Sequence, residues 1–345
     1  MIIKDNKKIT KFKSKDIENK IICGDTLEVL RKIPSKSIQT IITSPSYFLK
    51  KEYERDETFQ NYIDIHKKIL EETKRVLKDN GAIFWNVAQT VIEGEIIPLG
   101  AIFYSTFKDL DYFLKNWIIW KFEGGECPKN RLFGRYENVL WFVKNKENFI
   151  FNIDDVRIPT KWLHDKRVRK DGKNPEDFWI FDERKNFEKI SNIRNKIVKL
   201  KKLISEKSGD YVNQILMDEI TRDLEDELNN LLETENNIIQ KNLSDNIWHI
   251  NRVVNISKSQ KIKHPKTQQT HPCPFPEMLI ERVIKMSSNK NDLILDIFSG
   301  SGTAMKVAND LERKWCGIDR DIKYCEIAKF RIQTNKSKQL KILYS

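Results

Sequence analysis

The stretch NDLILDIFSGSGTAMKVANDL, residues 291–311, decides the predicted fold. Its apolar run from Leu293 to Leu295 predicts a buried strand, and Gly300 and Gly302 predict a tight turn after it. The residues from Thr303 onward predict a helix. A strand, a glycine turn and a helix in this order are typical of an α/β protein with a parallel sheet.

Residues 296–303, DIFSGSGT, are named the glycine loop. The carboxylate of Asp296 ends the predicted strand, and the glycines leave room for a ligand to approach the backbone. Asp319 ends the next predicted strand, KWCGID, nineteen residues past Gly300, about the spacing at which a carboxylate binds ribose hydroxyls. Met305 replaces the third glycine of a dinucleotide fingerprint. The pattern therefore favours S-adenosylmethionine, with Asp296 on its ammonium group and Asp319 on its ribose.

A second motif, QTIITSPSYF, occupies residues 39–48. Ile41 and Ile42 predict a short buried strand. The four residues after Thr43 are named the Ser-Pro turn: Ser44, Pro45, Ser46 and Tyr47. Because proline stiffens the turn and lacks an N–H group, the nearby hydroxyls and carbonyls are expected to point outward as acceptors, which suits a planar base with an amino group. Taken alone, this short motif favours an ordinary Ser-Pro turn with a surface tyrosine, and the glycine loop is needed beside it to support a base-binding role.

Length and composition indicate a globular protein. A chain of 345 residues suits one large α/β domain with an insertion, or two domains. No apolar run approaches the roughly 20 residues of a membrane span. Residues 1–20 are polar and charged, unlike a signal peptide. We therefore expect a cytoplasmic protein that does not enter a membrane.

The charge points to a polyanionic partner, since the net charge is +12. Lysine-rich proteins of other kinds share this feature. The five cysteines form no C-x-x-C pair, and the five histidines are scattered, so we expect neither a disulfide framework nor a metal site.

Several further elements follow from apolar periodicity. KIICGD, residues 20–25, predicts a strand, and Asp25 or Thr26 is expected to cap the helix after it. A helix from residue 61 to 77 is expected to end at Asn80-Gly81. The remaining predictions are strands at 81–87, 117–122 and 137–144 and helices at 97–113, 277–286 and 322–332.

The central region differs from both ends. Residues 161–173, KWLHDKRVRKDGK, hold six basic residues against two acidic ones, a mixture suited to phosphate contacts or simply to a solvated loop. The candidate DNA-binding residues are Lys161, Lys166, Arg167, Arg169, Lys170 and Lys173. Residues 186–240 predict an αα-hairpin with a basic and an acidic arm, which favours a self-packed insertion over a partner-binding coiled coil.

Together the two motifs resemble the DNA amino-methyltransferases. DIFSGSGT resembles their cofactor loop, and TSPSY resembles their catalytic Asp/Asn/Ser-Pro-Pro-Tyr turn, with Ser46 in place of the second proline. The catalytic turn comes first, as in the circularly permuted β group. HPCPFPE, GKNPEDFW and DNIWHINRV resemble further family segments, so the resemblance covers roughly residues 18–160 and 245–335.

This resemblance implies a Rossmann-like, circularly permuted α/β methyltransferase sheet with an inserted target-recognition region. Residues 1–160 would form the catalytic half, 161–246 the insertion with its helical hairpin, and 247–345 the cofactor-binding half. The cofactor would be S-adenosylmethionine. The residues implied to bind it are Asp25, Asp296, Phe298, Ser299, Gly300, Ser301, Gly302, Thr303 and Asp319.

The implied reaction is methyl transfer to the exocyclic N4 amine of cytosine in double-stranded DNA, by base flipping and direct in-line displacement. Ser44 and Pro45 would accept the amine hydrogens, and Tyr47 would stack on the base. A serine at the first turn position resembles the N4-cytosine enzymes, with N6-adenine methylation as the alternative. The resemblance also implies a separately encoded restriction endonuclease, whereas the oligomeric state stays open.

Other hypotheses keep weaker support. Pro272-Cys273 and Glu137-Asn138-Val139 match motifs of cytosine-C5 methyltransferases, but both precede the cofactor loop in reverse order, so we interpret them as coincidence. An RNA or small-molecule methyltransferase, and a non-catalytic DNA-binding protein with a decayed site, remain. The intact Asp296, Gly300, Gly302, Asp319 and Ser44 set speaks against decay.

Overall fold

The computed structural model describes residues 2–5, 9–49, 58–122, 128–132, 134–157, 174–180, 226 and 275–343. The chain divides into two units, residues 1–156 with 252–345, and residues 157–251. The predicted basic run at 161–173, the helical hairpin at 186–240 and Cys273 lie outside the described residues. The functional assignment of the three chain segments therefore stays a prediction.

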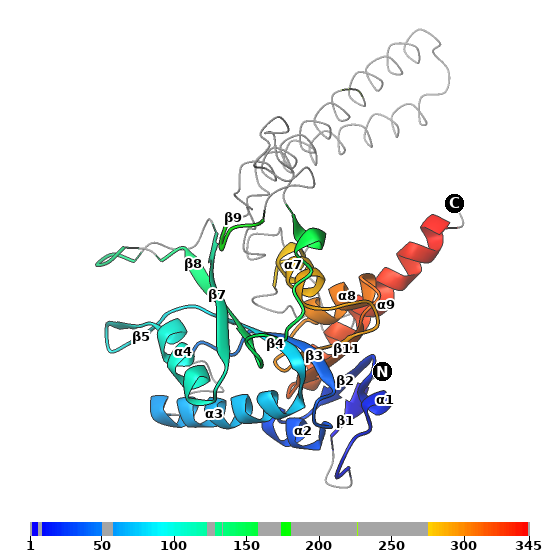
Figure 1. Ribbon diagram of the computed structural model, residues 1–345, viewed down its shortest axis with the longest axis horizontal. Helices are drawn as coiled ribbons and strands as arrows, with labels where there is room; N and C mark the ends of the chain where they lie inside the picture. Colours follow the sequence, from blue (N-terminus) through cyan, green and yellow to red (C-terminus); the bar gives the residue numbers. More distant parts are fainter. Residues whose placement is uncertain are drawn as a thin grey trace, which may run out of the picture. The chain divides into compact units, whose positions relative to one another are not determined.

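A mixed sheet forms the centre of the first unit (Figure 1). Its strands are β1 (Ile2–Lys4), β2 (Lys20–Cys23), β3 (Ile38–Thr43), β4 (Leu77–Val87), β7 (Phe113–Lys121), β8 (Tyr136–Val143), β10 (Leu293–Asp296) and β11 (Lys314–Asp319). They lie in the order β1-β2-β11-β10-β3-β4-β8-β7. The pairs from β1 to β4 are parallel, and β8 is antiparallel to both β4 and β7. The predicted parallel sheet is confirmed, and the late strands add an antiparallel edge.

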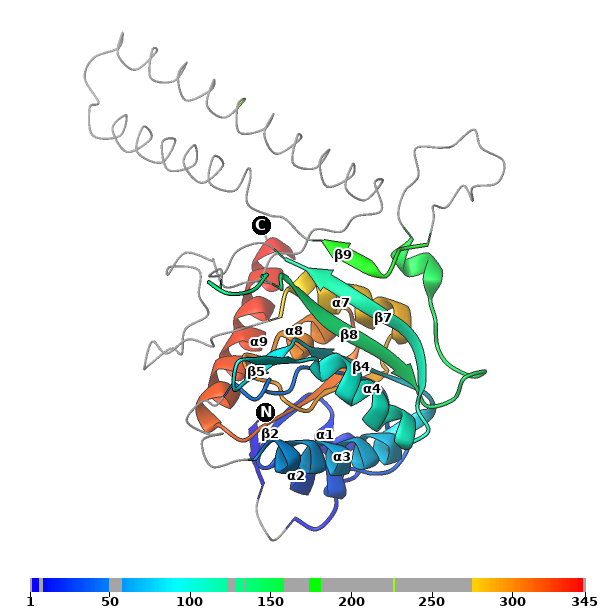
Figure 2. The same ribbon diagram turned by 90° about the vertical axis from the view of Figure 1, so that its left-hand side faces the viewer.

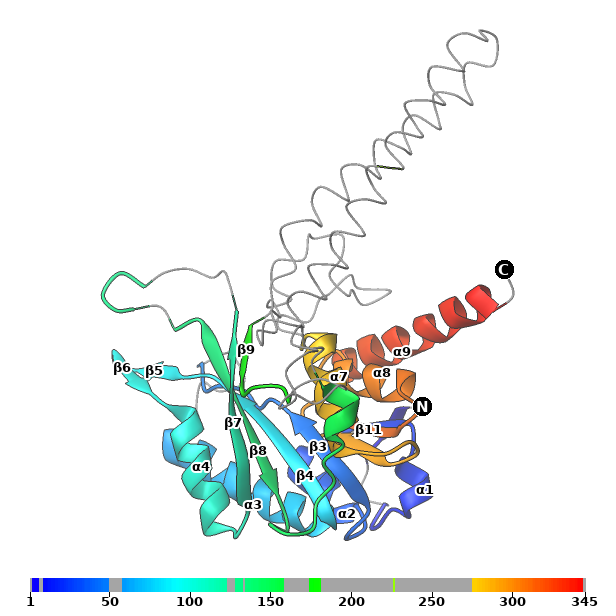
Figure 3. The ribbon, with the colours of Figure 1, turned by 45° about the horizontal axis from the view of Figure 1, so that its top comes forward.

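Helices cover both faces of this sheet (Figure 3). One face carries α2 (Thr26–Lys32), α3 (Phe59–Val76) and α4 (Leu99–Asp109), and the other carries α7 (Glu277–Ser287), α8 (Thr303–Asp310) and α9 (Ile322–Leu343). The unit also contains α1 (Ser14–Ile17), the 3-10 helix η2 (Ile153–Val156) and the hairpin β5 (Thr90–Ile92) with β6 (Glu95–Ile97). Within the described residues, no helix is both long and apolar enough to cross a membrane.

Little of the second unit is described. It contributes the strand β9 (Phe178–Ile180). Arg157 Nη1 donates a hydrogen bond to Asn174 Oδ1 at 2.8 Å.

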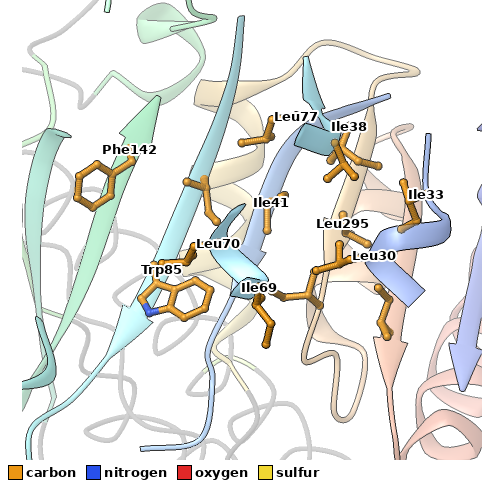
Figure 4. Close-up of a cluster of buried hydrophobic side chains, with 14 of the residues drawn as sticks. Leu30, Ile33, Ile38, Ile41, Ile69, Leu70, Leu77, Trp85, Phe142 and Leu295 are labelled. Atoms are coloured by element: carbon orange, nitrogen blue, oxygen red, sulfur yellow. The ribbon is translucent and has the colours of Figure 1, made fainter. Parts of the chain in front are cut away.

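The core between α2, α3 and the sheet is built from branched aliphatic side chains. Figure 4 shows Leu30 of α2 and Leu70 of α3 directed toward Ile41 and Leu295 of the strands. Burying each such side chain is worth about 1.5–3 kcal/mol. α2 and α3 lie side by side (Figure 2), and Arg75 Nη2 of α3 donates to the carbonyl of Leu30, one of the last carbonyls of α2, at 2.8 Å. The helix end is thus satisfied by its neighbour.

Several helices and strands begin or end at other residues than predicted. α3 ends at Val76 and β4 begins at Leu77, so the predicted helix end at Asn80-Gly81 is wrong. Pairing of Leu77 with Ile38 draws these residues into the sheet. β7 likewise starts at Phe113 rather than at residue 117, and α9 continues past residue 332 to Leu343. The sequence analysis predicted neither β1 nor the β5–β6 hairpin. Of the two predicted caps, Asp25 is the one at the N-terminus of α2.

Gly302 has a conformation and surroundings that exclude a side chain. Its φ is +78°, and a Cβ atom would lie 2.7 Å from the Cβ of Ala328 on α9. Gly302→Ala is therefore expected to lower the free energy of unfolding by about 2–4 kcal/mol, through backbone strain and overpacking together. Urea denaturation measures this change.

Gly94→Ala provides the matched control, because Gly94 has φ +88° but nothing within 4 Å of the place that a Cβ atom would take. Only the strain, about 1–2 kcal/mol, should appear there. Equal losses in the two variants would show that the contact with Ala328 does not constrain the glycine loop.

Candidate active site

The two motifs of the sequence meet at one edge of the sheet. β3 and β10 are adjacent parallel strands, with Ile41 beside Leu295. Their carboxyl ends therefore lie together, and Thr43 Oγ1 donates a hydrogen bond to Asp296 Oδ1 at 2.9 Å. This bond joins the start of the Ser-Pro turn to the start of the glycine loop. Parallel α/β sheets bind ligands at this edge.

Asp296 is a buried carboxylate with only 3% of its surface exposed. Burial raises the pKa of this group to about 7, although hydrogen bonds from Thr43 and from the backbone N–H of Phe298 oppose the rise. The carboxylate of Asp319 adds to it. A cation placed beside this buried carboxylate would stabilise its charged form.

Asp319 holds the glycine loop in shape. Its carboxylate accepts the backbone N–H of Gly300 at 2.8 Å and that of Asp321 at 2.9 Å. Burial raises the pKa of Asp319, and these two N–H groups oppose the rise. Ser299 N–H donates to the carbonyl of Ile318 at 2.9 Å, so the loop is bonded to the end of β11 at two points.

The hydroxyls of Ser301 and Thr303 face α9. Arg331 Nη1 donates to Thr303 Oγ1 at 2.7 Å and contacts Ser301 Oγ at 3.4 Å. Arg331 Nη2 also donates to Glu277 Oε1 at 2.7 Å. The two hydroxyls therefore anchor the start of α8 to its neighbouring helices, a role that the sequence analysis did not predict.

Phe298 and Ser299 line the inner side of the loop. The half-buried ring of Phe298 lies 5.9 Å from the ring of His66 and 6.3 Å from that of Trp85, measured between centroids. Burial lowers the pKa of His66 to about 4, so this ring is neutral at pH 7. Ser299 Oγ is buried and has no hydrogen-bond partner within the part of the chain that the structure describes.

Asp25 lies at the same edge of the sheet, one strand further along. It follows β2, which is paired in parallel with β11 so that Cys23 lies beside Asp319. The Asp25 carboxylate accepts the backbone N–H of Glu28 at 3.1 Å as the cap of α2. The structure thus brings Asp25, Asp296 and Asp319 to the ends of neighbouring strands, as the sequence analysis expected.

The Ser-Pro turn belongs to a polar cluster. Ser44 Oγ and Tyr47 Oη are 2.8 Å apart, and Tyr47 Oη donates to Glu137 Oε2 at 2.7 Å. Asn86 Nδ2 donates to the same Glu137 oxygen at 2.6 Å and to Tyr47 Oη at 2.8 Å. Pro45 is buried, whereas Ser44 and Tyr47 are half-buried.

Sequence reasoning missed Asn86 and Glu137. Both lie in strands, on β4 and β8, and are buried, at 2% and 5% exposure. The sequence analysis considered Glu137 only as part of a coincidental Glu-Asn-Val match. The signal was present, since a carboxylate and an amide stand inside the otherwise apolar runs AIFWNV and ENVLWFV, and buried polar groups need partners.

The candidate DNA-binding residues and the expected absence of a metal site stay predictions. The candidate DNA-binding residues from Lys161 to Lys173 lie outside the described residues. For metals, the described ranges contain no cluster of three or more His, Cys, Asp or Glu side chains arranged to hold an ion.

Proteins with similar sequences are DNA methylases. A family model described as DNA methylase, of N6/N4 type, matches residues 38–330. The type II methyltransferase M.BglII of Bacillus subtilis is 29% identical over 322 residues, which cover 90% of this chain and 68% of the relative.

Solved structures share the fold. The cytosine-N4-specific PvuII DNA methyltransferase matches with a TM-score of 0.56 at 19% identity, over 90% of this chain and 85% of that one. A structure described as a DNA modification methylase of Thermus thermophilus, complexed with S-adenosyl-L-methionine, has a TM-score of 0.50 at 18% identity, over 90% and 92%. The predicted α/β architecture is confirmed.

Proposed function

Because the chain belongs to the N6/N4 DNA methylase family, the DNA amino-methyltransferases of restriction-modification systems, we propose that it methylates the N4 amine of cytosine in double-stranded DNA with S-adenosylmethionine. The observation that carries the proposal is the hydrogen bond between Thr43 and Asp296. It holds a base-binding turn and a cofactor-binding carboxylate at one edge of the sheet, as methyl transfer between two bound molecules requires.

The residues at the sheet edge fit the cofactor. Asp296 is a buried carboxylate that a neighbouring cation would stabilise, and the ammonium group of S-adenosylmethionine would supply one. Asp319 would accept from the ribose hydroxyls, and Asp25 would lie near the adenine. When bound, the cofactor supplies an electrophilic methyl group.

The Ser-Pro turn would supply the hydrogen-bond acceptors that an exocyclic amine needs before it can attack. The lone pair of an exocyclic amine is delocalised into the base, so hydrogen bonds to both amine hydrogens are required to localise it. Ser44 Oγ and the carbonyl of Pro45 would accept those hydrogens. The base must leave the duplex to reach them, and the ring of Tyr47 would stack on it. Attack on the methyl carbon then needs no covalent enzyme intermediate.

Base choice and DNA recognition extend the proposal. Serine at position 44 favours cytosine N4, and N6-adenine methylation on the same fold is the alternative. The residues from Lys161 to Lys173 would contact phosphates, within a target-recognition insertion. The catalytic turn precedes the cofactor loop along the chain, which supports the permuted β group. A separately encoded restriction endonuclease would be the biological partner.

The product of the reaction tests the proposal. We expect purified protein, unmethylated DNA and S-adenosylmethionine to yield N4-methylcytosine, identified by mass spectrometry of the digested nucleosides. Reactions without protein and with Asp319→Ala protein are the controls. N6-methyladenine would retain the mechanism and overturn the base assignment, whereas no methylated nucleoside on any DNA would overturn the proposed function.

A further inference from the structure

The hydrogen bonds around Ser44 have a fixed direction. A tyrosine hydroxyl carries one hydrogen, and that of Tyr47 is donated to Glu137 Oε2 at 2.7 Å. In the 2.8 Å contact between Ser44 Oγ and Tyr47 Oη, the serine must therefore be the donor. The only hydrogen of Ser44 is then committed to Tyr47. Asn86 Nδ2 reaches Ser44 Oγ at a long 3.5 Å, and the remaining lone pair of the hydroxyl is left for another donor.

The hydrogen bonds of Asn86 support the same assignment of donors and acceptors. The carboxylate of Glu137 only accepts, so the amide nitrogen of Asn86, 2.6 Å away, must face it. The same nitrogen donates to Tyr47 Oη at 2.8 Å. Tyr47 Oη thus receives donors from two sides while its own hydrogen goes to Glu137.

We propose that Glu137 is a positioning residue which, acting through Tyr47, fixes Ser44 as a hydrogen-bond acceptor for the amine of the target base. The inference rests on the proposed function, because it concerns the same methyl transfer. Glu137 is 5% exposed, so its orientation is set inside the fold before any base enters. Preorganised groups of this kind cost nothing to align during the reaction.

Removing the Glu137 carboxylate should reverse the direction of the hydrogen bond between Ser44 and Tyr47. Without an acceptor at Glu137, the hydrogen of Tyr47 would turn to Ser44 Oγ and occupy the lone pair that the amine needs. We expect Glu137→Met, of similar volume, to lower kcat about 10- to 100-fold. KM for DNA and the fluorescence of 2-aminopurine placed next to the target base should stay unchanged, because base flipping and stacking do not use this bond. Glu137→Gln keeps an acceptor oxygen and should stay within about fivefold of wild type.

The double variant gives the sharpest readout. Tyr47→Phe deletes the hydroxyl that would turn toward Ser44, so in the Glu137→Met background it should raise kcat rather than lower it further. Tyr104→Phe is the matched control and should leave kcat unchanged, because Tyr104 is a half-exposed residue of α4 whose ring is tilted against that of Trp117, 6.1 Å away between centroids. Wild-type kcat in Glu137→Met, or a double variant slower than both single variants, would overturn the inference.

Failure of the proposed function is recognised separately. If the wild type methylates no DNA, thermal denaturation still tests the hydrogen-bond chain, because Glu137→Met and Tyr47→Phe then share one lost interaction. Their decreases in melting temperature should add to more than the decrease in the double variant. Fully additive decreases in melting temperature would contradict the hydrogen-bond chain from Ser44 through Tyr47 to Glu137, whatever the substrate of the protein.

Discussion

Replacing Asp296 with asparagine should make the ligand-free protein more stable at pH 8, by about 2–4 kcal/mol, while weakening S-adenosylmethionine binding about a hundredfold. Burial raises the pKa of this carboxyl to about 7 in the folded state. The unfolded chain releases the proton near pH 4. Between these values the folded state binds more protons, so the free energy of unfolding falls as the pH rises from about 4 to about 7.

Asparagine removes this pH dependence because it stays neutral. It also keeps an oxygen that can accept from Thr43 and from the backbone N–H of Phe298, so the loop should retain its shape. Above pH 7 the wild type carries the full cost of a buried charge, and the variant carries none. The same charge is what the cofactor's ammonium group would pair with, so binding should be lost.

Urea denaturation at pH 5 and pH 8 and calorimetric titration of S-adenosylmethionine at pH 8 measure the two effects. Asp64→Asn is the control, because Asp64 is exposed on α3, where its carboxylate accepts a hydrogen bond from Gln60, and neither quantity should change. A loss of stability at pH 8 in Asp296→Asn would contradict the raised pKa. Unchanged cofactor affinity would contradict the ammonium contact.

Ser44→Ala should lower kcat about a hundredfold or more, with the dissociation constant for DNA changed less than about twofold. The hydroxyl is expected to accept an amine hydrogen only as the amine attacks, so its removal affects the reaction rather than binding. Single-turnover methylation and fluorescence anisotropy with labelled DNA separate the two.

Ser46→Ala provides the matched control in the same turn. Tyr62 Oη donates to the backbone carbonyl of Ser46 at 2.6 Å, and this contact survives the substitution. Its kcat should stay near that of the wild type. Equal losses in the two variants would indicate that the turn itself was disturbed, and no loss in Ser44→Ala would place the acceptor elsewhere.

Local patterns in the sequence predicted the sheet and its ligand-binding edge. Asp296 and Asp319 follow apolar runs directly and Asp25 follows one after Gly24, so their places at strand ends could be read from the sequence. The neighbouring positions of these strands could also be inferred, because one helix remains after β11 and KIICGD supplies the next strand. The resemblance of the two motifs indicated that they belong to one site.

Tertiary contacts could not be predicted in the same way. Glu137 is 90 residues from Tyr47 along the chain, and only the antiparallel pairing of β8 with β4 brings it to the Ser-Pro turn. Ser301 and Thr303 were predicted to bind the cofactor, and the sequence does not show that Arg331 contacts their hydroxyls. The end of α3 was misplaced because Asn80-Gly81 is a common helix stop, whereas pairing with β3 decides the boundary here.

The strand order also has a consequence for biosynthesis. β10 and β11, made late, lie between β2 and β3, made early. While the ribosome is still translating the middle of the chain, β2 and β3 each lack a neighbour, and their unpaired edges are open to association with other nascent chains. The sheet can close only after residue 319 has left the exit tunnel. Production of this protein should therefore depend on chaperones that shield early strands for most of the translation time.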